Sequence, residues 1–312
     1  MTKKESKTRK SKASELRVGS ASQLFNFSQN SYLERTSRPI YAIWFLVPFI
    51  VFYEIGTIWI NTDVLNQSEV RVVAFVWLRE LLESIGLGGK FAWVSPPLVV
   101  IAILLGLQFA SGKRWQFVGS DVFPMGAECI VLAVPLVVLG LFLNSPSLPR
   151  SDASPVAAAS IQMQSHAASD AACAVPLLAA RSVGPPPRKM LLPEIVTGIG
   201  AGIYEELIFR LILICLLMML FQDALRLSHT NSAILSVLIS AALFSAHHHI
   251  VFLDGQFGRI ADFNWTKFSF RTMAGVYFSV LFAIRGFGIT AGTHAFYDII
   301  ATVLNVFFFQ AE

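Results

Sequence analysis

The chain has 312 residues, of which 54% are hydrophobic and only 14% are charged. Soluble domains average about 25% charged residues, so this composition excludes an ordinary soluble domain and indicates a membrane protein with several spans. The formal net charge is +4, but residues 1–38 hold nine Lys and Arg against three Glu. A basic segment before the first span predicts a cytoplasmic N-terminus, and it carries no motif that would indicate nucleic-acid binding. The three cysteines are scattered, which predicts neither a disulfide framework nor a thiolate metal site.

The N-terminal half divides into a tail, a group of spans and a loop. Residues 1–39 are polar and rich in Lys and Ser, which predicts a basic, disordered tail. Residues 40–143 hold the N-terminal transmembrane helices, and within them residues 69–87 alternate apolar and charged residues at helical spacing. That spacing predicts an amphipathic helix on the membrane surface. Residues 144–190 are a low-complexity loop rich in Ser, Ala and Pro.

The C-terminal part, residues 191–309, begins with a long apolar segment, Leu191–Phe221. Its length exceeds the ~20 residues needed to cross a bilayer, which predicts a tilted helix or a break near Gly198–Gly202. The predicted spans along the whole chain are Tyr41–Ile60, Val94–Ser111, Ala127–Leu143, Leu191–Phe221, Ser232–Phe252, Ser269–Ile284 and Phe287–Phe308. The expected fold is therefore an all-α, polytopic transmembrane bundle of about seven spans plus one interfacial helix.

Three ionisable residues interrupt the apolar segment Leu191–Phe221. Glu206 and Arg210 are four residues apart on one helix face, so they are expected to pair. Glu205 lies about 100° around the helix and is left without a local partner. Charges at membrane depth are costly and mark functional sites. Glu54, alone in the first span, is expected to be a polar group that is hydrogen-bonded inside the bundle or lies near an interface.

Two later spans carry more polar residues. One contains Phe244 and the run His247–His248–His249; the other contains His294 and Asp298, four residues apart. Three helices that each contribute polar groups can build one buried cluster. Such a cluster could simply hold the helices together, but two histidines and a spare carboxylate favour a functional site.

The order of these residues resembles the CAAX-prenyl protease and bacteriocin-processing family of intramembrane proteases. The family pattern reads Glu-Glu-x-x-x-Arg, then Phe-x-x-x-His, then His-x-x-x-Asn/Asp. It is matched here by Glu205–Glu206 to Arg210, by Phe244 to His248, and by His294 to Asp298. The resemblance covers roughly residues 191–308 and marks 191–309 as the catalytic core.

The resemblance implies a role for each matched residue. Glu205 is the expected general base, and His248 positions the attacking water or shares its proton. His294 is expected to stabilise the oxyanion. The eukaryotic proteases have Asn where this chain has Asp298, and an ionised Asp cannot donate a hydrogen bond. Asp298 is therefore expected to orient His294.

The same resemblance assigns the remaining residues to the surroundings of the site. Glu206 and Arg210 are expected to orient Glu205, Arg210 also to contact the substrate backbone, and Phe244 to help orient the site. Because Phe244 selects His248, the neighbours of His248 are expected to point elsewhere on the helix, where they line the cavity or cap the span.

Several alternatives remain open at this stage. The family works without a metal, so no cofactor is expected, but Glu205, His248 and His294 are also a possible His₂Glu zinc set. A non-catalytic membrane immunity or scaffold protein is a second alternative, and a transporter that uses the cluster as an ion site is a third.

The expected activity is an intramembrane endopeptidase that cleaves a membrane-associated, lipidated or exported protein or peptide near its membrane end. The expected partners are that substrate and the lipid bilayer, with no nucleic acid. The tail and the loop favour a bacterial relative, so the expected location is multi-pass in the inner (plasma) membrane with a cytoplasmic N-terminus.

Overall fold

The structure is a computed structural model that describes residues 27–28, 30–63, 72–87, 94–144, 191–253, 256–259 and 263–309. The elements in chain order are α1 (Tyr32–Thr36), α2 (Pro39–Asp63), α3 (Val73–Ser84), α4 (Ser95–Ser111), η2 (Gly119–Asp121), α5 (Val122–Asn144), α6 (Leu191–Glu206), η4 (Leu207–Leu213), α7 (Ile214–Met218), η5 (Met219–Ala224), α8 (His229–His247), β1 (Ile250–Leu253), β2 (Gln256–Arg259), α9 (Trp265–Arg285), α10 (Phe287–Leu304) and η6 (Asn305–Phe309). Of the η elements, η4, η5 and η6 are π-helical, whereas η2 is a 3₁₀ turn.

The polytopic helical fold is confirmed. Five helical stretches within the described residues are long and apolar enough to cross a membrane: Pro39–Ile60, Gly119–Leu143, Leu191–Ala224, His229–His247 and Phe287–Phe307. The α4 helix is apolar but shorter, with 17 residues. The predicted span in α9 is not among the five. The predicted number of seven spans is thus not confirmed.

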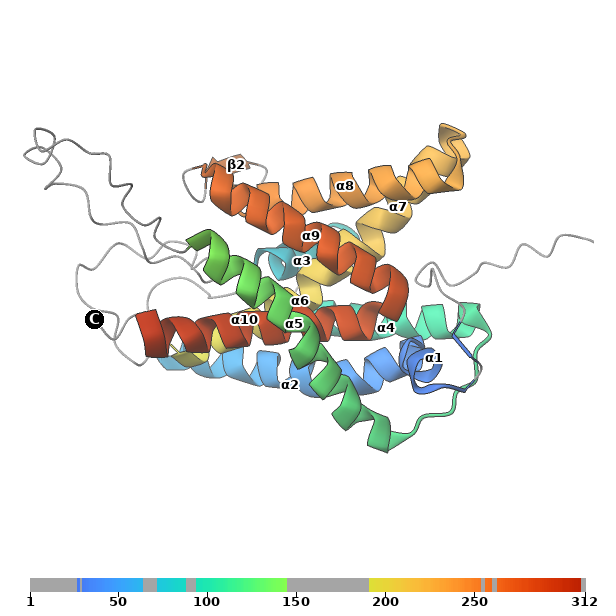
Figure 1. Cartoon of the computed structure of the whole chain (residues 1–312), viewed down its shortest axis with the longest axis horizontal. Helices are drawn as coiled ribbons and strands as arrows, with labels where there is room; N and C mark the ends of the chain where they lie inside the picture. The colour runs from blue at the N-terminus through green and yellow to red at the C-terminus, as the bar shows by residue number, and fades with distance from the viewer. Residues whose placement is uncertain are drawn as a thin grey trace, which may run out of the picture.

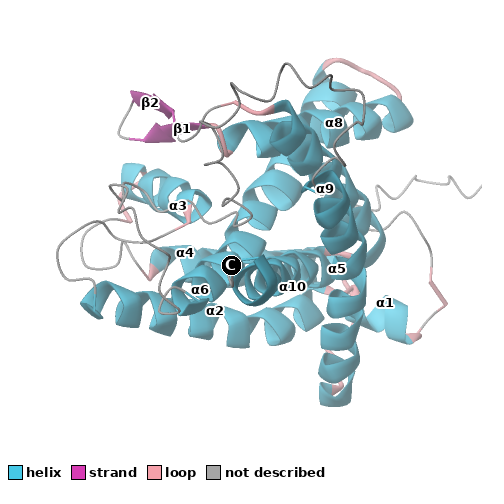
Figure 2. Cartoon of the chain, turned by 60° about the vertical axis from the view of Figure 1, so that its left-hand side comes forward, coloured by secondary structure: helices cyan, strands magenta, loops and turns pink. Residues whose placement is uncertain are grey.

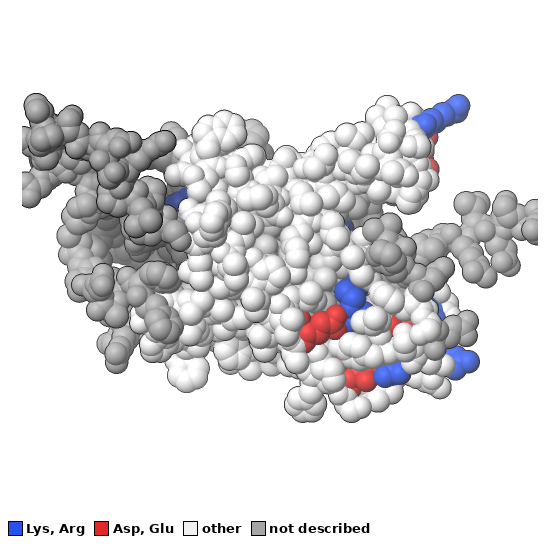
Figure 3. All heavy atoms as spheres, viewed as in Figure 1, with Lys and Arg blue, Asp and Glu red and all other residues white. Residues whose placement is uncertain are grey.

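The α10 helix is the centre of the bundle. Of its apolar stretch 67% is buried, against 39% or less in the other four. Figure 1 shows α10 beside α2, with α5 crossing both, and Figure 2 shows α8 and α9 packed on the other side. On the face shown in Figure 3 most charged atoms gather near α1 and at one far corner, some basic atoms show at the left edge, and the broad middle is largely uncharged. An uncharged middle band is the surface expected of a protein in lipid.

Small residues allow α6 and α10 to touch. A Cβ on Gly202 would lie 2.6 Å from the backbone nitrogen of Ala295, and one on Gly198 would lie 2.7 Å from Cβ of Asp298. Of the two predicted alternatives, a tilt or a break near Gly198–Gly202, the break is wrong, because α6 runs through these glycines as regular α-helix. The glycines serve close packing instead. The hydrogen-bond pattern changes later, at Leu207, directly after Glu206.

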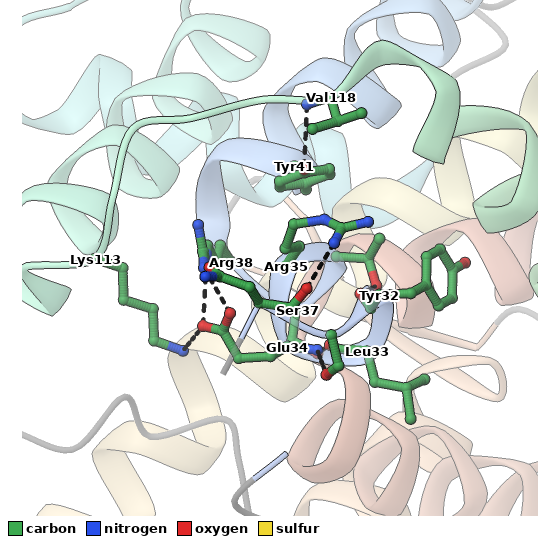
Figure 4. Close-up of polar contacts among 12 residues, drawn as sticks. Tyr32, Leu33, Glu34, Arg35, Ser37, Arg38, Tyr41, Lys113 and Val118 are labelled. Carbon is green, nitrogen blue, oxygen red and sulfur yellow. Dashed lines mark hydrogen bonds and ion pairs between the residues drawn. The ribbon is translucent and has the colours of Figure 1, made fainter. Parts of the chain in front are cut away.

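The segment before the first span is ordered from α1 onward, which corrects the prediction of a disordered tail for this part of residues 1–39. Figure 4 shows α1 held by ion pairs. Arg38 binds Glu34 on one side of the segment, and the Arg35 guanidinium lies 3.0 Å from the Asp121 carboxylate on the other. These pairs fix the chain as it enters α2.

The end of α9 holds the same short helix. Arg285 donates through Nε and Nη2 to both carboxylate oxygens of Glu128, at 2.6 and 2.8 Å. It also donates to Oγ1 of Thr36, Oγ of Ser37 and the carbonyl oxygen of Leu33, each at 2.8 Å. A buried guanidinium is stable only when its donors are satisfied in this way.

A helix is present within the predicted residues 69–87 as α3, and its place at the membrane surface stays a prediction. Its apolar face packs on protein: Phe75 is fully buried, with its ring 5.0 Å from that of Tyr204 and 6.0 Å from that of Tyr53. The hydroxyl of Tyr204 donates to Glu54 at 3.3 Å, as expected for a hydrogen-bonded acid inside the bundle. The predicted loop at 144–190 falls outside the described residues, apart from Asn144 at the end of α5.

The fifth predicted span, Ser232–Phe252, is displaced in the structure. Its helix begins at His229, where the Ser228 side chain caps the first turn, and it ends at His247. Residues 250–253 instead form β1 of a short antiparallel hairpin with β2. The predicted span therefore extends beyond the end of the helix, because the apolar residues of β1 cannot be told from those of the helix by hydropathy alone.

Candidate functional site

The first part of the site comes from the junction of α6 and η4. Glu205, Glu206 and Arg210 are all at most 2% exposed. The Nε of Arg210 lies 3.1 Å from Oε2 of Glu206, so the predicted pair is confirmed. The guanidinium also lies 4.1 Å from the ring centre of Phe244. This cation therefore has a carboxylate on one side and an aromatic face on the other.

The second part comes from the end of α8. Nε2 of His247 lies 3.3 Å from Oε1 of Glu205, and Nε2 of His248 lies 4.0 Å from Oε2 of the same carboxylate. The two imidazole rings are 3.9 Å apart. The interpretation that the neighbours of His248 point elsewhere is thus wrong for His247. His247 is the last residue of α8 and His248 is its C-cap, and both side chains lie near the Glu205 carboxylate.

The tautomer of His247 follows from its contacts. Its Nδ1 lies 2.5 Å from the carbonyl oxygen of Phe244. A carbonyl oxygen only accepts, so Nδ1 carries a hydrogen and donates. The other ring nitrogen, Nε2, faces Oε1 of Glu205 at 3.3 Å. Glu205 therefore has a partner for proton transfer within the site.

The third part comes from α10. Nδ1 of His294 lies 2.7 Å from Oε1 of Glu206, and its ring stacks on Phe278 with centroids 4.6 Å apart. Glu206 thus holds His294, whereas it was expected to orient Glu205. Nε2 of His294 is 3.6 Å from Oδ2 of Asp298, beyond hydrogen-bond length. Asp298 neighbours this ring without fixing it.

Phe244 joins the two halves of the site. Its ring is 5.5, 5.3 and 5.9 Å from those of His247, His248 and His294 respectively. One half pairs Glu205 with the histidines of α8, and the other pairs Glu206 with Arg210 and His294. All the residues that the sequence selected are therefore brought together, and His247 is the one it missed.

Several buried polar atoms at the site have no hydrogen-bond partner within the described part of the chain. Among them are Oε2 of Glu205, Nε2 of His248 and Oδ2 of Asp298, and outside the Glu206–Arg210 ion pair no hydrogen bond reaches Oε2 of Glu206 or Nε of Arg210. Buried polar atoms normally have partners, so such atoms suit a water or a substrate group. Glu205, His247 and His248 also form a possible metal-binding group, because one ligand atom from each lies within 4.8 Å of the others. The predicted zinc set contained His294 in place of His247, and His294 does not belong to this group.

The fold and the site define an integral membrane protein with carboxylates and histidines buried together inside its helices. Residues 187–300 match the family model described as type II CAAX prenyl endopeptidase Rce1-like. This match covers the part of the chain that carries the three motifs, and its description is that of the protease family they indicated. No curated protein and no solved structure matches the chain.

Proposed function

We propose that this protein is an intramembrane endopeptidase in which Glu205 activates the attacking water. The observation that carries the proposal is the contact of this buried carboxylate with two imidazoles, His247 and His248, at 3.3 and 4.0 Å. The match to a protease family over the same residues supports it.

The reaction follows from these groups. A water between Glu205 and His248 gives a proton to the carboxylate while its oxygen attacks the peptide carbonyl carbon. The carbonyl oxygen becomes an oxyanion in the tetrahedral intermediate. When the intermediate collapses, the carbon–nitrogen bond breaks and the proton passes from Glu205 to the leaving amine. That proton is carried by Oε2 of Glu205, and His247 contacts the other carboxylate oxygen through Nε2 and keeps Glu205 in place.

His294 is the proposed oxyanion donor. Because its Nδ1 donates to the Glu206 carboxylate, a protonated ring has its Nε2 hydrogen left to donate. Arg210 holds Glu206 from the other side. A donor positioned before the reaction stabilises the developing charge at little reorganisation cost.

The proposed substrate is a membrane-associated, lipidated or exported protein or peptide that is cut near its membrane end. A prenylated tail is one such substrate, and an exported protein with a membrane anchor is another. The proposed location is a bacterial inner membrane. The N-terminus lies in the cytoplasm, because basic residues before a first span favour that side.

The test compares the protein termini in host membranes that carry wild-type protein or Glu205→Gln at equal expression. Glu194→Gln is the matched control, because Glu194 is a carboxylate at the start of the same helix. New termini are expected with the wild type and with Glu194→Gln only. Termini that persist with Glu205→Gln would remove Glu205 as the base.

A zinc peptidase is the second candidate, and the grouping of Glu205, His247 and His248 is what favours it. The Nδ1 of His247 is bonded to a backbone carbonyl, an arrangement that is common for metal-binding histidines. Zinc would supply Lewis-acid activation of water. Metal analysis of purified protein decides: stoichiometric zinc that is lost in His247→Ala supports this candidate, and cleavage unchanged in metal-free protein contradicts it.

A further inference from the structure

A second pair of polar residues, Arg271 on α9 and His249 just after α8, lies beside the residues assigned above. Arg271, Gly275 and Phe278 are spaced four and three residues apart, so they share one face of this helix. That face looks toward the site: the carbonyl oxygen of Gly275 accepts from Arg210 at 3.4 Å, and Phe278 stacks on His294. Arg271 therefore lies on the same face, one turn before Gly275.

Arg271 lies near the site but takes part in none of the contacts described above. Arg271 is near enough to His248, His249 and Asp298 to act on each of them electrostatically. Arg271 is half-buried, and within the described ranges it forms no ion pair and no hydrogen bond. Lys267, one turn earlier on α9, adds positive charge near His249. A half-buried cation without a partner is a ready acceptor for an anion.

His249 is the second member of this pair. Its side chain is 3% exposed and lies against the rings of Phe263 and Phe268, at 5.2 and 6.3 Å. Neither ring nitrogen has a hydrogen-bond partner in the part of the chain that the structure describes. Ser245 donates to the carbonyl oxygen of Phe268 at 2.8 Å, which ties the end of α8 to the first turn of α9. That tie holds His249 close to Arg271.

We propose that Arg271 and His249 bind a carboxylate of the substrate and thereby fix which peptide bond reaches Glu205. A guanidinium binds a carboxylate through two parallel hydrogen bonds, and an imidazole nitrogen supplies a third. One arginine and one histidine match the charge of a single carboxylate. This inference rests on the proposed peptidase activity and adds a specificity to it.

Two sources of that carboxylate are compatible with the site: the free C-terminus of the substrate and an Asp or Glu side chain. Either one, bound beside His248 and Asp298, places the scissile bond a few residues away. The protein then cleaves at a fixed number of residues from the bound carboxylate. Neutral or amidated substrates are cut slowly and at scattered positions.

Cleavage is tested with acylated synthetic peptide pools and the full-length protein in lipid vesicles. The first pool ends in a free carboxylate, the second is the same pool with a terminal amide, and the third is an amide pool that contains one Glu. Wild-type protein should cut the first or the third pool at one fixed distance from the carboxylate, and the amide pool at least tenfold more slowly. The arm that is preferred identifies the source.

The variants separate binding from catalysis. Arg271→Gln should raise KM about tenfold or more for the preferred pool with a small change in kcat. Arg271→Lys keeps the positive charge, so its KM should lie between those of the wild type and Arg271→Gln. Arg114→Gln is the matched control, because Arg114 is exposed and lies outside the site. Equal use of all pools by the wild type, or a preference unchanged in Arg271→Gln, overturns the proposal.

Binding is measured separately in the Glu205→Gln background, in which the peptidase activity is removed. Fluorescent acid and amide pools are titrated onto Glu205→Gln and onto Glu205→Gln/Arg271→Gln, and Kd is compared. Tighter binding of the acid pool that is lost in the double variant supports the carboxylate site even if no cleavage is seen. Equal Kd values overturn it, whatever becomes of the proposed activity.

Discussion

Replacing Gly202 with Ala tests whether the α6–α10 contact holds the site together. The added Cβ would lie 2.6 Å from the backbone nitrogen of Ala295 and 2.8 Å from the carbonyl oxygen of Ala291. Ordinary contacts begin at 3.4 Å, so the two helices must separate by roughly 0.8 Å. Both neighbours are backbone atoms and cannot rotate away as a side chain does.

The expected magnitude has two parts. An alanine in a helix gains about 1 kcal/mol over glycine, and overpacking a tight contact costs about 1–3 kcal/mol. Gly106→Ala is the control, because Gly106 is helical and its Cβ would meet nothing within 4 Å. We expect Gly202→Ala to have a free energy of unfolding about 2 kcal/mol or more below that of Gly106→Ala.

The peptidase activity of Gly202→Ala should also fall, because the site residues on α6 and α10 move apart. Separation of α6 from α10 lengthens the 2.7 Å contact between Glu206 and His294. Misplacement by about 1 Å can cost a hundredfold in rate, so we expect a loss of that order in kcat. Thermal unfolding in detergent and turnover of the substrate found in host membranes are measured on both variants. If Gly202→Ala matches Gly106→Ala in both, the contact does not position the site.

Further predictions concern the buried ion pairs and the oxyanion donor. Arg210→Ala leaves the Glu206 carboxylate uncompensated and should lower the free energy of unfolding by about 3–5 kcal/mol. The half-exposed pair of Arg79 with Glu83 has the same spacing, so Arg79→Ala should cost about 1 kcal/mol or less; equal losses contradict the reasoning. His294→Ala should reduce kcat by about a hundredfold or more with little change in substrate Kd, and an unchanged kcat rules it out as the oxyanion donor. Arg285→Met should make α1 susceptible to proteolysis at native temperature, and continued resistance would show that its bonds are dispensable.

The sequence predicted the pairing of Glu206 with Arg210 because helical spacing alone decides it. It also predicted that three distant segments meet, since charged and imidazole groups have few other partners at membrane depth. It could not predict that His247 faces Glu205. That depends on where α8 stops, and the apolar run continues into β1 without a signal. The three adjacent histidines were the available clue, because a polar run at a helix end often faces inward from both sides of the stop.

The partner of Glu206 was beyond sequence reasoning for a different reason. Whether it supports Glu205 or His294 depends on how closely α6 and α10 approach, and that distance is set by which glycines meet which backbone atoms. The helical tail segment was missed because its order comes from tertiary contacts, chiefly the bonds of Arg285, which lies about 250 residues later in the chain.

The corner between α9 and α10 sets how the site residues on these two helices lie relative to one another. A single residue, Gly286, joins the two helices, and its φ of +76° is a conformation that other residues rarely adopt. Arg285, directly before Gly286, is hydrogen-bonded to α1 and α5, so these two helices hold the corner in place. Because Phe278 lies on one arm of this corner and His294 on the other, the angle between the arms sets the spacing from Arg271 to the oxyanion donor. The length of substrate between its bound carboxylate and its cleaved bond is thereby determined by a turn that contacts neither.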